Sequence, residues 1–298
     1  MSLFRLADDL PALDAPVLVA ALEGWVDAGT AGTLAARQLA LHGRAVATCD
    51  PDAIYDYRAR RPTLDISDGR PMRLDWAELS LTAVRHGDRD VLVLRGPEPD
   101  YRWRELSADI VALGRELGVV SWVSLGAIPA AVPHTRPVPI LATASAPGLL
   151  PDGIRQGPDG LLRVPAAALS VMEVAMAGAG IPAVGLFAQV PHYVNGPYPT
   201  ASLALLASLG TFLGFELPVG TLATQALERR GLLDAAAASD EDTRAHVERL
   251  ELLADQSRLP AGDELIAEIE RFLRETDEGG EEPGGSGEGG GPGGTRLH

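Results

Sequence analysis

The stretch that most constrains the fold spans residues 16–41, PVLVAALEGWVDAGTAGTLAARQLAL. Residues 17–22 form a short, wholly apolar run, which is typical of a strand buried on both faces. Residues 23–29 then break both periodicities, and from Thr30 alanine and leucine recur at helical spacing. The stretch therefore predicts a strand, a glycine-rich turn and a helix. The turn would lie at the carboxyl end of a central strand, where open α/β sheets usually place their sites.

The turn itself offers two chemical readings. Asp27 or Thr30 can cap the following helix, whose free N–H groups would also attract an anion. Glu23 and Asp27 could instead act as a carboxylate pair, although the cap is the favoured role for Asp27. The sequence of the turn matches neither the G-x-G-x-x-G nor the G-K-[ST] phosphate-binding pattern.

Apolar runs and helical patterns alternate through the next 170 or so residues, as in a mostly parallel sheet covered by helices on both faces. The fold class we expect is therefore α/β, a three-layer α/β/α sandwich. Segment 54–65 suits an exposed element near a site or interface, and 72–84 suits one or two strands. The remaining expected strands are 44–48, 91–94, 119–125, 140–143 and 183–190, and the expected helices are 103–117, 164–177 with Pro165 in its first turn, and 200–213.

The character of the chain changes after residue 220. Three amphipathic helices are expected at 222–233, 242–253 and 263–273, the second opening on a capping-box-like Ser239. The final stretch is rich in glycine and glutamate and has almost nothing to bury, so we expect it to be disordered. The expected organisation is a main domain at 1–220, a helical appendage at 221–275 and a tail at 276–298.

Composition excludes several classes of function. A net charge of −16 argues against a nucleic-acid surface, and the absence of lysine removes P-loop, Schiff-base and protein-kinase chemistry. The single cysteine, Cys49, allows no internal disulfide and no multi-cysteine zinc site. The six histidines are scattered, so we expect no metal and no cofactor. No apolar run spans a membrane and no secretory signal is visible, which favours the cytoplasm.

Two loops that each follow a buried strand carry the tripeptide Val-Pro-His, ending at His134 and His192. If both strands run parallel to the first, these histidines share one sheet edge with the 23–29 turn, where they could act as acid–base groups. The alternative is that proline fixes each loop and histidine caps carbonyl groups. Arginines beside proline are the better anion ligands. The candidate pocket comprises Glu23, Trp25, Asp27, Arg61, His134, Arg136, His192 and Tyr193.

Five motifs spread over about residues 15–215 belong together in order and spacing. They are EGWVDAGTAG (23–32), YDYRARRP (55–62), GPEPDYRWREL (96–106), SLGAIPAAVPHTRP (124–137) and QVPHYVNGPYP (189–199). With them the chain resembles the PAC2 family, named for proteasome assembly chaperone 2, and in particular its actinobacterial branch. The region 221–275 also resembles the extension of that branch.

The resemblance implies a sandwich similar to the purine nucleoside phosphorylase fold, often assembled as a homotrimer. Characterised relatives chaperone proteasome assembly, so proteasome subunits are the implied partners. Some relatives dock through a C-terminal hydrophobic-Tyr-any tripeptide, which the final Arg296-Leu297-His298 does not match. The leading hypothesis is a non-enzymatic assembly chaperone or protein-interaction module. The alternative is an enzyme or sensor that binds a nucleoside-like or anionic ligand at the strand-end loops.

Overall fold

The computed structural model describes residues 2–256, and a sheet of eight strands forms its centre. The strands are β1 (Phe4–Leu6), β2 (Val17–Glu23), β3 (Arg44–Cys49), β6 (Ser80–His86), β7 (Arg89–Pro97), β8 (Ser121–Ala130), β9 (Ile140–Ala144) and β10 (Ala183–Pro191). Their order across the sheet is β1-β3-β6-β7-β2-β8-β10-β9. Strand β2, built from the stretch on which the sequence analysis began, therefore lies near the middle of the sheet.

The central strands run parallel and the flanking ones run against them. Strand β2 pairs in parallel with β7 and β8, and β8 pairs in parallel with β10. On one side β6 is antiparallel to β7, and on the other side β9 is antiparallel to β10. The predicted α/β class is confirmed, with a parallel centre that carries the strand-end loops and antiparallel strands beside it.

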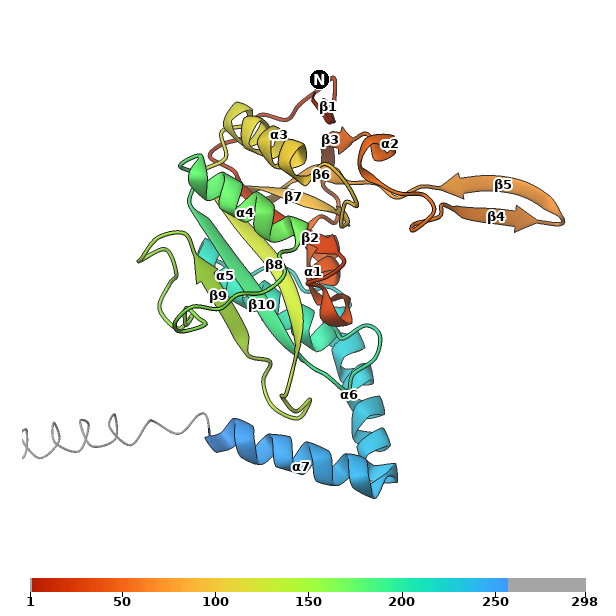
Figure 1. Cartoon of the computed structure of the whole chain (residues 1–298), viewed down its shortest axis with the longest axis vertical. Coiled ribbons are helices and arrows are strands. Elements are labelled where there is room, and N and C mark those ends of the chain that lie inside the picture. Colours follow the sequence, from red (N-terminus) through yellow and green to blue (C-terminus); the bar gives the residue numbers. More distant parts are fainter. Residues whose placement is uncertain (1, 257–298) are drawn as a thin grey trace, which may run out of the picture. The chain divides into compact units, whose positions relative to one another are not determined.

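Helices cover both faces of the sheet, as predicted (Figure 1). Helices α1 (Ala31–Leu39) and α5 (Pro199–Leu213) pack on one face, and α3 (Trp103–Glu116) and α4 (Ala168–Gly178) pack on the other. The core has two layers accordingly. In β2, Leu18 faces the α3–α4 layer and Val19 faces the α1–α5 layer, and both are fully buried. Burial on both faces explains why this strand is apolar from Val17 to Leu22, before the exposed Glu23 at its end.

Two expectations about element boundaries need correction. Helix α4 begins at Ala168 instead of residue 164, so Pro165 precedes the helix and lies exposed. The segment around residues 54–84 contains the short helix α2 (Pro51–Ile54) and then the hairpin strands β4 (Thr63–Ser67) and β5 (Arg70–Asp75). These two strands pair only with each other, and every residue in them is exposed. The hairpin projects away from the sheet (Figure 1).

Helices α6 (Leu222–Ser239) and α7 (Glu241–Gln256) confirm the first two helices predicted after residue 220. The cap of α7 is Asp240 and not the predicted Ser239, because the backbone N–H of Thr243 donates to Asp240 Oδ2 at 2.8 Å. The chain divides into two compact units, 1–252 and 253–298. The third predicted helix and the predicted tail lie outside the described residues.

Among the residues that the structure describes, no helix combines the length and the apolar character needed to cross a membrane.

Candidate functional site

The carboxyl ends of the parallel strands meet at one edge of the sheet, which we call the carboxyl edge. The turn at 23–29 and both Val-Pro-His loops lie there, as the sequence predicts for parallel strands. Two backbone contacts join them: Asp27 forms an isolated parallel bridge with Ala127 of β8, and the N–H of His192 donates to the carbonyl of Ala130 at 3.0 Å. The carboxyl edge is thus a connected layer of loops.

The helices that follow β2 and β7 lie on opposite faces of the sheet, and the gap between such strand ends is where α/β proteins usually bind ligands. Here the side chain of Glu98, directly after β7, occupies that gap. Its Oε2 accepts the N–H of Trp25 at 3.1 Å and its Oε1 accepts the N–H of Ala168 at 2.7 Å. Because Ala168 opens α4, the carboxylate lies where a helix N-terminus would hold an anion.

The first two candidates, Glu23 and Trp25, flank this carboxylate through their backbone. The carbonyl of Glu23 accepts the N–H of Glu98 at 2.8 Å, and both side chains point away from the core. Between them, a Cβ at Gly24 would lie 2.6 Å from the Cβ of Glu98, so the close approach requires glycine. The indole of Trp25 is 67% exposed, which leaves a large aromatic surface free on the carboxyl edge.

Asp27 caps helix α1, as predicted, from a position before the first turn. Its Oδ1 accepts the N–H of Gly32 at 2.8 Å and of Thr33 at 3.2 Å, and its Oδ2 accepts the Thr33 hydroxyl. Burial raises the pKa of this carboxyl, and the hydrogen bonds from Thr33 and Gly32 oppose that rise. A Cβ at Gly32 would meet the carbonyl of Leu125 at 2.7 Å, so α1 packs closely on β8.

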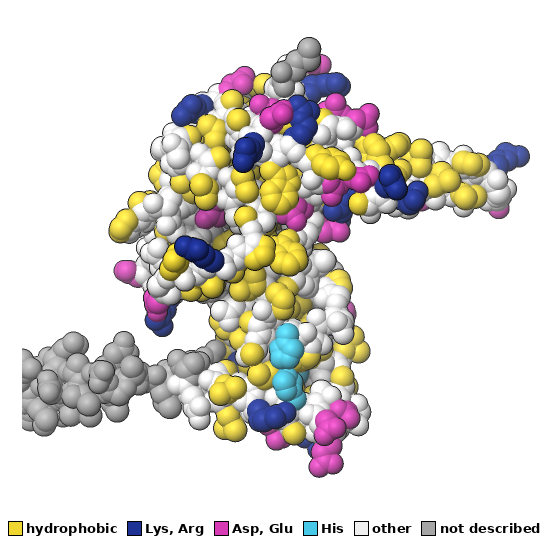
Figure 2. Space-filling view, in the orientation of Figure 1, with side chains coloured by type: hydrophobic (Ala, Val, Ile, Leu, Met, Phe, Trp, Pro, Cys, Tyr) yellow, Lys and Arg dark blue, Asp and Glu magenta, His cyan; other side chains and the backbone are white. Residues whose placement is uncertain are grey.

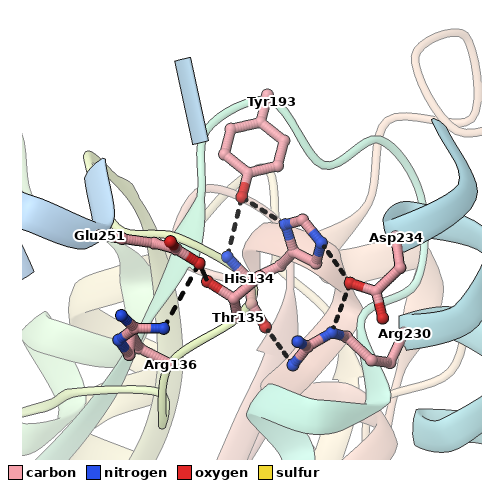
Figure 3. A network of polar contacts seen from close by, with 7 residues as sticks. All are labelled: His134, Thr135, Arg136, Tyr193, Arg230, Asp234 and Glu251. Atoms are coloured by element: carbon pink, nitrogen blue, oxygen red, sulfur yellow. Dashed lines mark hydrogen bonds and ion pairs between the residues drawn. The ribbon is translucent and has the colours of Figure 1, made fainter. Parts of the chain in front are cut away.

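His134 is buried at the centre of a polar network (Figure 3). Its backbone N–H donates to the hydroxyl oxygen of Tyr193 at 2.8 Å, and its Nδ1 lies 2.7 Å from the same oxygen. Its Nε2 lies 3.1 Å from Oδ1 of Asp234 on α6. Arg230, one turn earlier on α6, donates to the carbonyl of His134 at 3.1 Å and to Asp234 at 2.8 Å. The network fastens α6 to the loop after β8.

One protonation pattern satisfies every member of this network. If Nε2 of His134 carries the proton and donates to Asp234, then Nδ1 accepts the hydroxyl proton of Tyr193. Burial lowers the pKa of His134 and outweighs the opposing hydrogen bond to Asp234, which favours the neutral ring at neutral pH. Burial alone would raise the pKa of Asp234, but the hydrogen bond and charge of Arg230 lower it. Both ring nitrogens of His134 are therefore occupied.

The two residues after His134 fasten helix α7 in a similar way. The Thr135 hydroxyl donates to Oε1 of Glu251, and Arg136 pairs with the same oxygen at 3.3 Å (Figure 3). The side chains of Arg136 and Glu251 are only 30% and 26% exposed. Arg136, predicted as an anion ligand, thus holds a carboxylate from its own chain. The arrangement continues the His134 network from α6 to α7.

The second Val-Pro-His loop lies beside the first but in a different environment. His192 is exposed, and its Nδ1 lies 3.2 Å from the carbonyl of Ala130. Its ring meets that of Tyr193 edge-on, with centroids 5.6 Å apart, and that of His246 on α7 at 5.3 Å. Burial raises the pKa of the Tyr193 hydroxyl to about 12. The structure thus brings His134, His192 and Tyr193 together.

Arg61 stands apart from the other candidates. It is exposed in the segment that leads into β4, and within residues 2–256 no hydrogen bond or ion pair joins it to the other seven. Sequence reasoning also missed the partners that complete the site, namely Glu98, Arg230, Asp234 and Glu251. Of these four residues, only Glu98 could have been recognised from the local sequence, because it follows a predicted buried strand and faces Gly24. The others come from helices distant in sequence.

The described residues contain no group of three or more histidine, cysteine, aspartate or glutamate side chains arranged to hold a metal ion. The chemistry available at the carboxyl edge is that of hydrogen bonds and exposed aromatic surface. The side chains of Asp27, Glu98, His134 and Arg136 are engaged with other parts of the chain, whereas the buried hydroxyl of Thr30 has no hydrogen-bond partner among the described residues. The contacts at the carboxyl edge hold the loops in place and attach helices α6 and α7 to them.

Comparison with known proteins places this arrangement among relatives. The model of the PAC2 family matches residues 21–237. Among the curated proteins, none matches this chain.

Three of the solved structures similar to this chain come from actinobacteria. A proteasome-assembly chaperone homologue from Mycobacterium tuberculosis is 36% identical, with 78% of this chain and 99% of that chain covered and a TM-score of 0.71. A PAC2 family protein from Streptomyces avermitilis is also 36% identical, with the same coverages and a TM-score of 0.70. A protein of unknown function from Corynebacterium glutamicum is 32% identical over 85% of this chain and 97% of that chain, with a TM-score of 0.80.

Proposed function

Because this chain belongs to the PAC2 family, we propose that it is a non-enzymatic assembly chaperone whose partners are proteasome subunits. The observation that carries this proposal is the 36% identity to a proteasome-assembly chaperone homologue, across 99% of that protein. Its setting would be the cytoplasm, and it would belong to the actinobacterial branch of the family. As in the resemblance above, the working form would be a homotrimer.

The geometry of the carboxyl edge supports a role without catalysis. The gap between β2 and β7 holds the carboxylate of Glu98, and both ring nitrogens of His134 have partners within the chain. A general acid or base needs a ring nitrogen that can reach a substrate proton. We therefore assign the buried Asp27 and His134 and the half-buried Arg136 the task of fixing the loops.

The exposed candidates would supply the contact with the partner. Trp25 is the strongest of them, since tryptophan is among the residue types that dominate binding energy at protein interfaces. His192 and Arg61 are the other exposed members. In this arrangement the buried network positions the loops, and Trp25 contacts the partner surface.

The test combines purified chain with unassembled proteasome subunits from the same organism. We expect a complex with the free subunits and faster formation of the assembled particle. Trp25→Ala should weaken the complex about tenfold or more while leaving the melting temperature unchanged. Val174→Ala is the matched control, because Val174 is an apolar residue 72% exposed on α4, far along the chain from the carboxyl edge. Failure to bind free subunits, with unchanged assembly, would refute the proposal.

A further inference from the structure

A pocket of about 510 Å³ lies at the edge of the sheet opposite the carboxyl edge, which we call the amino edge. Strand β6 runs against β7, so its last residue, His86, pairs with Arg89 at the beginning of β7. Strand β3 begins at the same edge, where Arg44 pairs with Ala83 of β6. The end of helix α1 and the loop after it, together with Pro218 after α5, complete the walls. This amino-edge pocket therefore lies at the other end of the strands from the candidate site.

Five residues that line the amino-edge pocket carry hydrogen-bond donors, and two of these are permanently charged. They are Gln38, His42, Arg44, Arg85 and His86. No aspartate or glutamate is among the described residues that line the pocket, although the whole chain has 41 acidic residues and 25 arginines. The net charge of −16 repels anions from the chain as a whole, so only a local group of donors like this one would hold an anion.

The remaining lining residues are apolar, namely Leu41, Ala83, Val84 and Pro218. Leu41 is exposed, Val84 is half-buried and Ala83 is buried. A volume of about 510 Å³ falls within the range of small-molecule sites, which combine apolar walls with a few placed polar groups. A bare inorganic anion would leave these apolar walls in water, so the lining suits an anion that is attached to an apolar body.

The two histidines of the pocket have ring nitrogens to offer a ligand. Nε2 of His86 lies 2.9 Å from the carbonyl oxygen of Leu39 at the end of α1, and because a carbonyl only accepts, this nitrogen donates. The other nitrogen, Nδ1, forms no hydrogen bond with any described residue. His42 forms no hydrogen bond or ion pair within residues 2–256, and its backbone has a left-handed φ of 63°. Glycine is favoured in this conformation, and other residues that adopt it are enriched at binding sites.

The two arginines of the pocket are held in place without using all of their donors. Arg85 donates from Nη1 to Asp90 at 3.2 Å and from Nη2 to the carbonyl of Asp88 at 3.4 Å. Arg44 donates from Nη2 to Asp9. A guanidinium carries more N–H donors than these contacts use, so each arginine keeps donors for a further acceptor. Because Asp9 and Asp90 balance the charges of the two arginines, the unused donors and the histidines would decide the affinity for an anion.

We propose that the amino-edge pocket binds a small organic anion, in which a phosphate or a carboxylate is attached to an apolar body. The anionic group accepts hydrogen bonds from the two arginines and from His42, and the apolar body covers Leu41 and Val84. Gln38 and His86 remain for polar groups on that body. This ligand is additional to the proposed protein partner, because the exposed candidates of the carboxyl edge lie at the other end of the strands.

Isothermal titration calorimetry on the full chain, in phosphate-free buffer at neutral pH, measures the binding of phenyl phosphate, benzoate, inorganic phosphate and phenol. The first two join an anionic group to an apolar ring, whereas inorganic phosphate lacks the ring and phenol lacks the charge. We expect at least one of the two organic anions to bind about tenfold more tightly than both inorganic phosphate and phenol. The tighter of the two identifies the preferred anionic group. Absence of binding by both organic anions overturns the proposal, and so does equally tight binding of phenol or of inorganic phosphate.

Substitutions at two exposed lining positions test whether the ligand binds in this pocket. His42→Gly removes the imidazole and suits the left-handed backbone, and Arg44→Gln removes a charge whose partner Asp9 is itself exposed. Each should weaken binding of the tighter probe about tenfold, because each removes a hydrogen bond to the anionic group. Arg104→Gln is the matched control, since Arg104 is exposed on α3, on the other face of the sheet from α1. The control should bind the probe as wild type does.

Circular dichroism and the melting temperature show that each variant is folded. If folded His42→Gly and Arg44→Gln both bind the probe as tightly as wild type, the ligand binds elsewhere and the proposal is overturned. Equal weakening by Arg104→Gln also overturns it, since overall charge and not the pocket would then govern binding. Trp25→Ala should leave probe binding unchanged. A chain that binds the probe in this pocket but does not bind free proteasome subunits refutes the chaperone function alone.

Discussion

At the scale of single residues, one tripeptide takes two different roles. Both Val-Pro-His loops follow parallel strands and end at the same edge, yet His134 is 2% exposed and His192 lies on the surface. The difference arises from what covers each loop. Helix α6 places Asp234 and Arg230 over His134, whereas the exposed ring of His192 contacts the carbonyl of Ala130 and the rings of Tyr193 and His246.

The first prediction follows from this contrast. His134→Ala should lower the free energy of unfolding by about 1–3 kcal/mol, because it empties a buried position and removes the hydrogen bonds of the ring with the Tyr193 hydroxyl and with Asp234. His192→Ala is the matched control and should stay within about 0.5 kcal/mol of wild type, since its ring is exposed. Urea unfolding measures both. Equal losses for the two variants would contradict the assigned roles.

The second prediction concerns pH. Burial lowers the pKa of His134 below its ordinary value of 6.5 in the folded protein, so around that pH the unfolded chain binds more protons. Stability from this residue is therefore complete above pH 6.5 and declines as the pH falls toward the folded pKa. Arg230, Asp234 and Glu251 share its surroundings.

His134→Gln keeps a hydrogen-bonding side chain and removes this titration. The free energy of unfolding is measured for wild type and variant between about pH 7.5 and 5. Wild type should lose stability faster than the variant as the pH falls, because protonation of His134 favours the unfolded chain. Asp27 and Glu173, whose pKa values burial raises, are present in both proteins and cancel in the difference. Parallel curves would show that His134 titrates normally.

At the scale of elements, the sequence predicts those helices and strands whose formation depends on the residues nearby in the chain. Strand β2 is apolar from Val17 to Leu22 because both faces are buried, and helix α3 repeats leucine and isoleucine on one face, so both were found. The start of α4 was misplaced because Pro165 suits a first turn, while the actual start is set by Glu98, 70 residues earlier in the chain. The hairpin β4–β5 was expected only as an exposed segment, since alternating residues do not reveal whether a strand joins the main sheet.

The candidate site shows the same limit. Parallel strands alone placed His134, His192 and the 23–29 turn at one edge, and that juxtaposition was predictable. Their chemistry was not, because the partners Asp234 and Glu251 come from helices 100 and 116 residues further along the chain. No local spacing encodes such pairs. His134, which resembles a catalytic base in the sequence, thus serves to attach helix α6 to the loop after β8.

Helix α7 provides the third prediction. Its described part buries only Val247 and Leu250, so its attachment depends in large part on the ring contacts of His246 and on the hydrogen bonds of Glu251 with Thr135 and Arg136. Glu251→Ala should speed amide hydrogen exchange in α7 by up to about tenfold, equivalent to roughly 1.4 kcal/mol, and leave α5 unchanged.

Glu248→Ala is the control for this prediction. Glu248 lies on the same helix and is exposed, and the structure gives it no hydrogen bond or ion pair within the described residues. Exchange in α7 should then match wild type. Faster exchange after both substitutions would mean that helix propensity or overall charge, and not the bond to Thr135 and Arg136, governs the attachment of α7.

At the scale of the whole molecule, charge and apolar surface act in opposite directions. A chain of net charge −16 repels its own copies, whereas exposed apolar side chains, such as those of the β4–β5 hairpin (Figure 2), favour contacts that remove them from water. Repulsion between whole molecules acts over distances that salt screens, about 10 Å at 0.1 M and 3 Å at 1 M. Apolar contact is not weakened by such screening, so the balance between the two should move with ionic strength.

The last prediction follows from this balance. Raising sodium chloride from about 0.05 to 0.5 M should lower the dissociation constant of the proposed homotrimer, because screening removes the repulsion between its copies. Sedimentation equilibrium at several concentrations measures the change. If salt instead dissociated the oligomer, ion pairs between the copies, and not apolar contact, would be its main attachment.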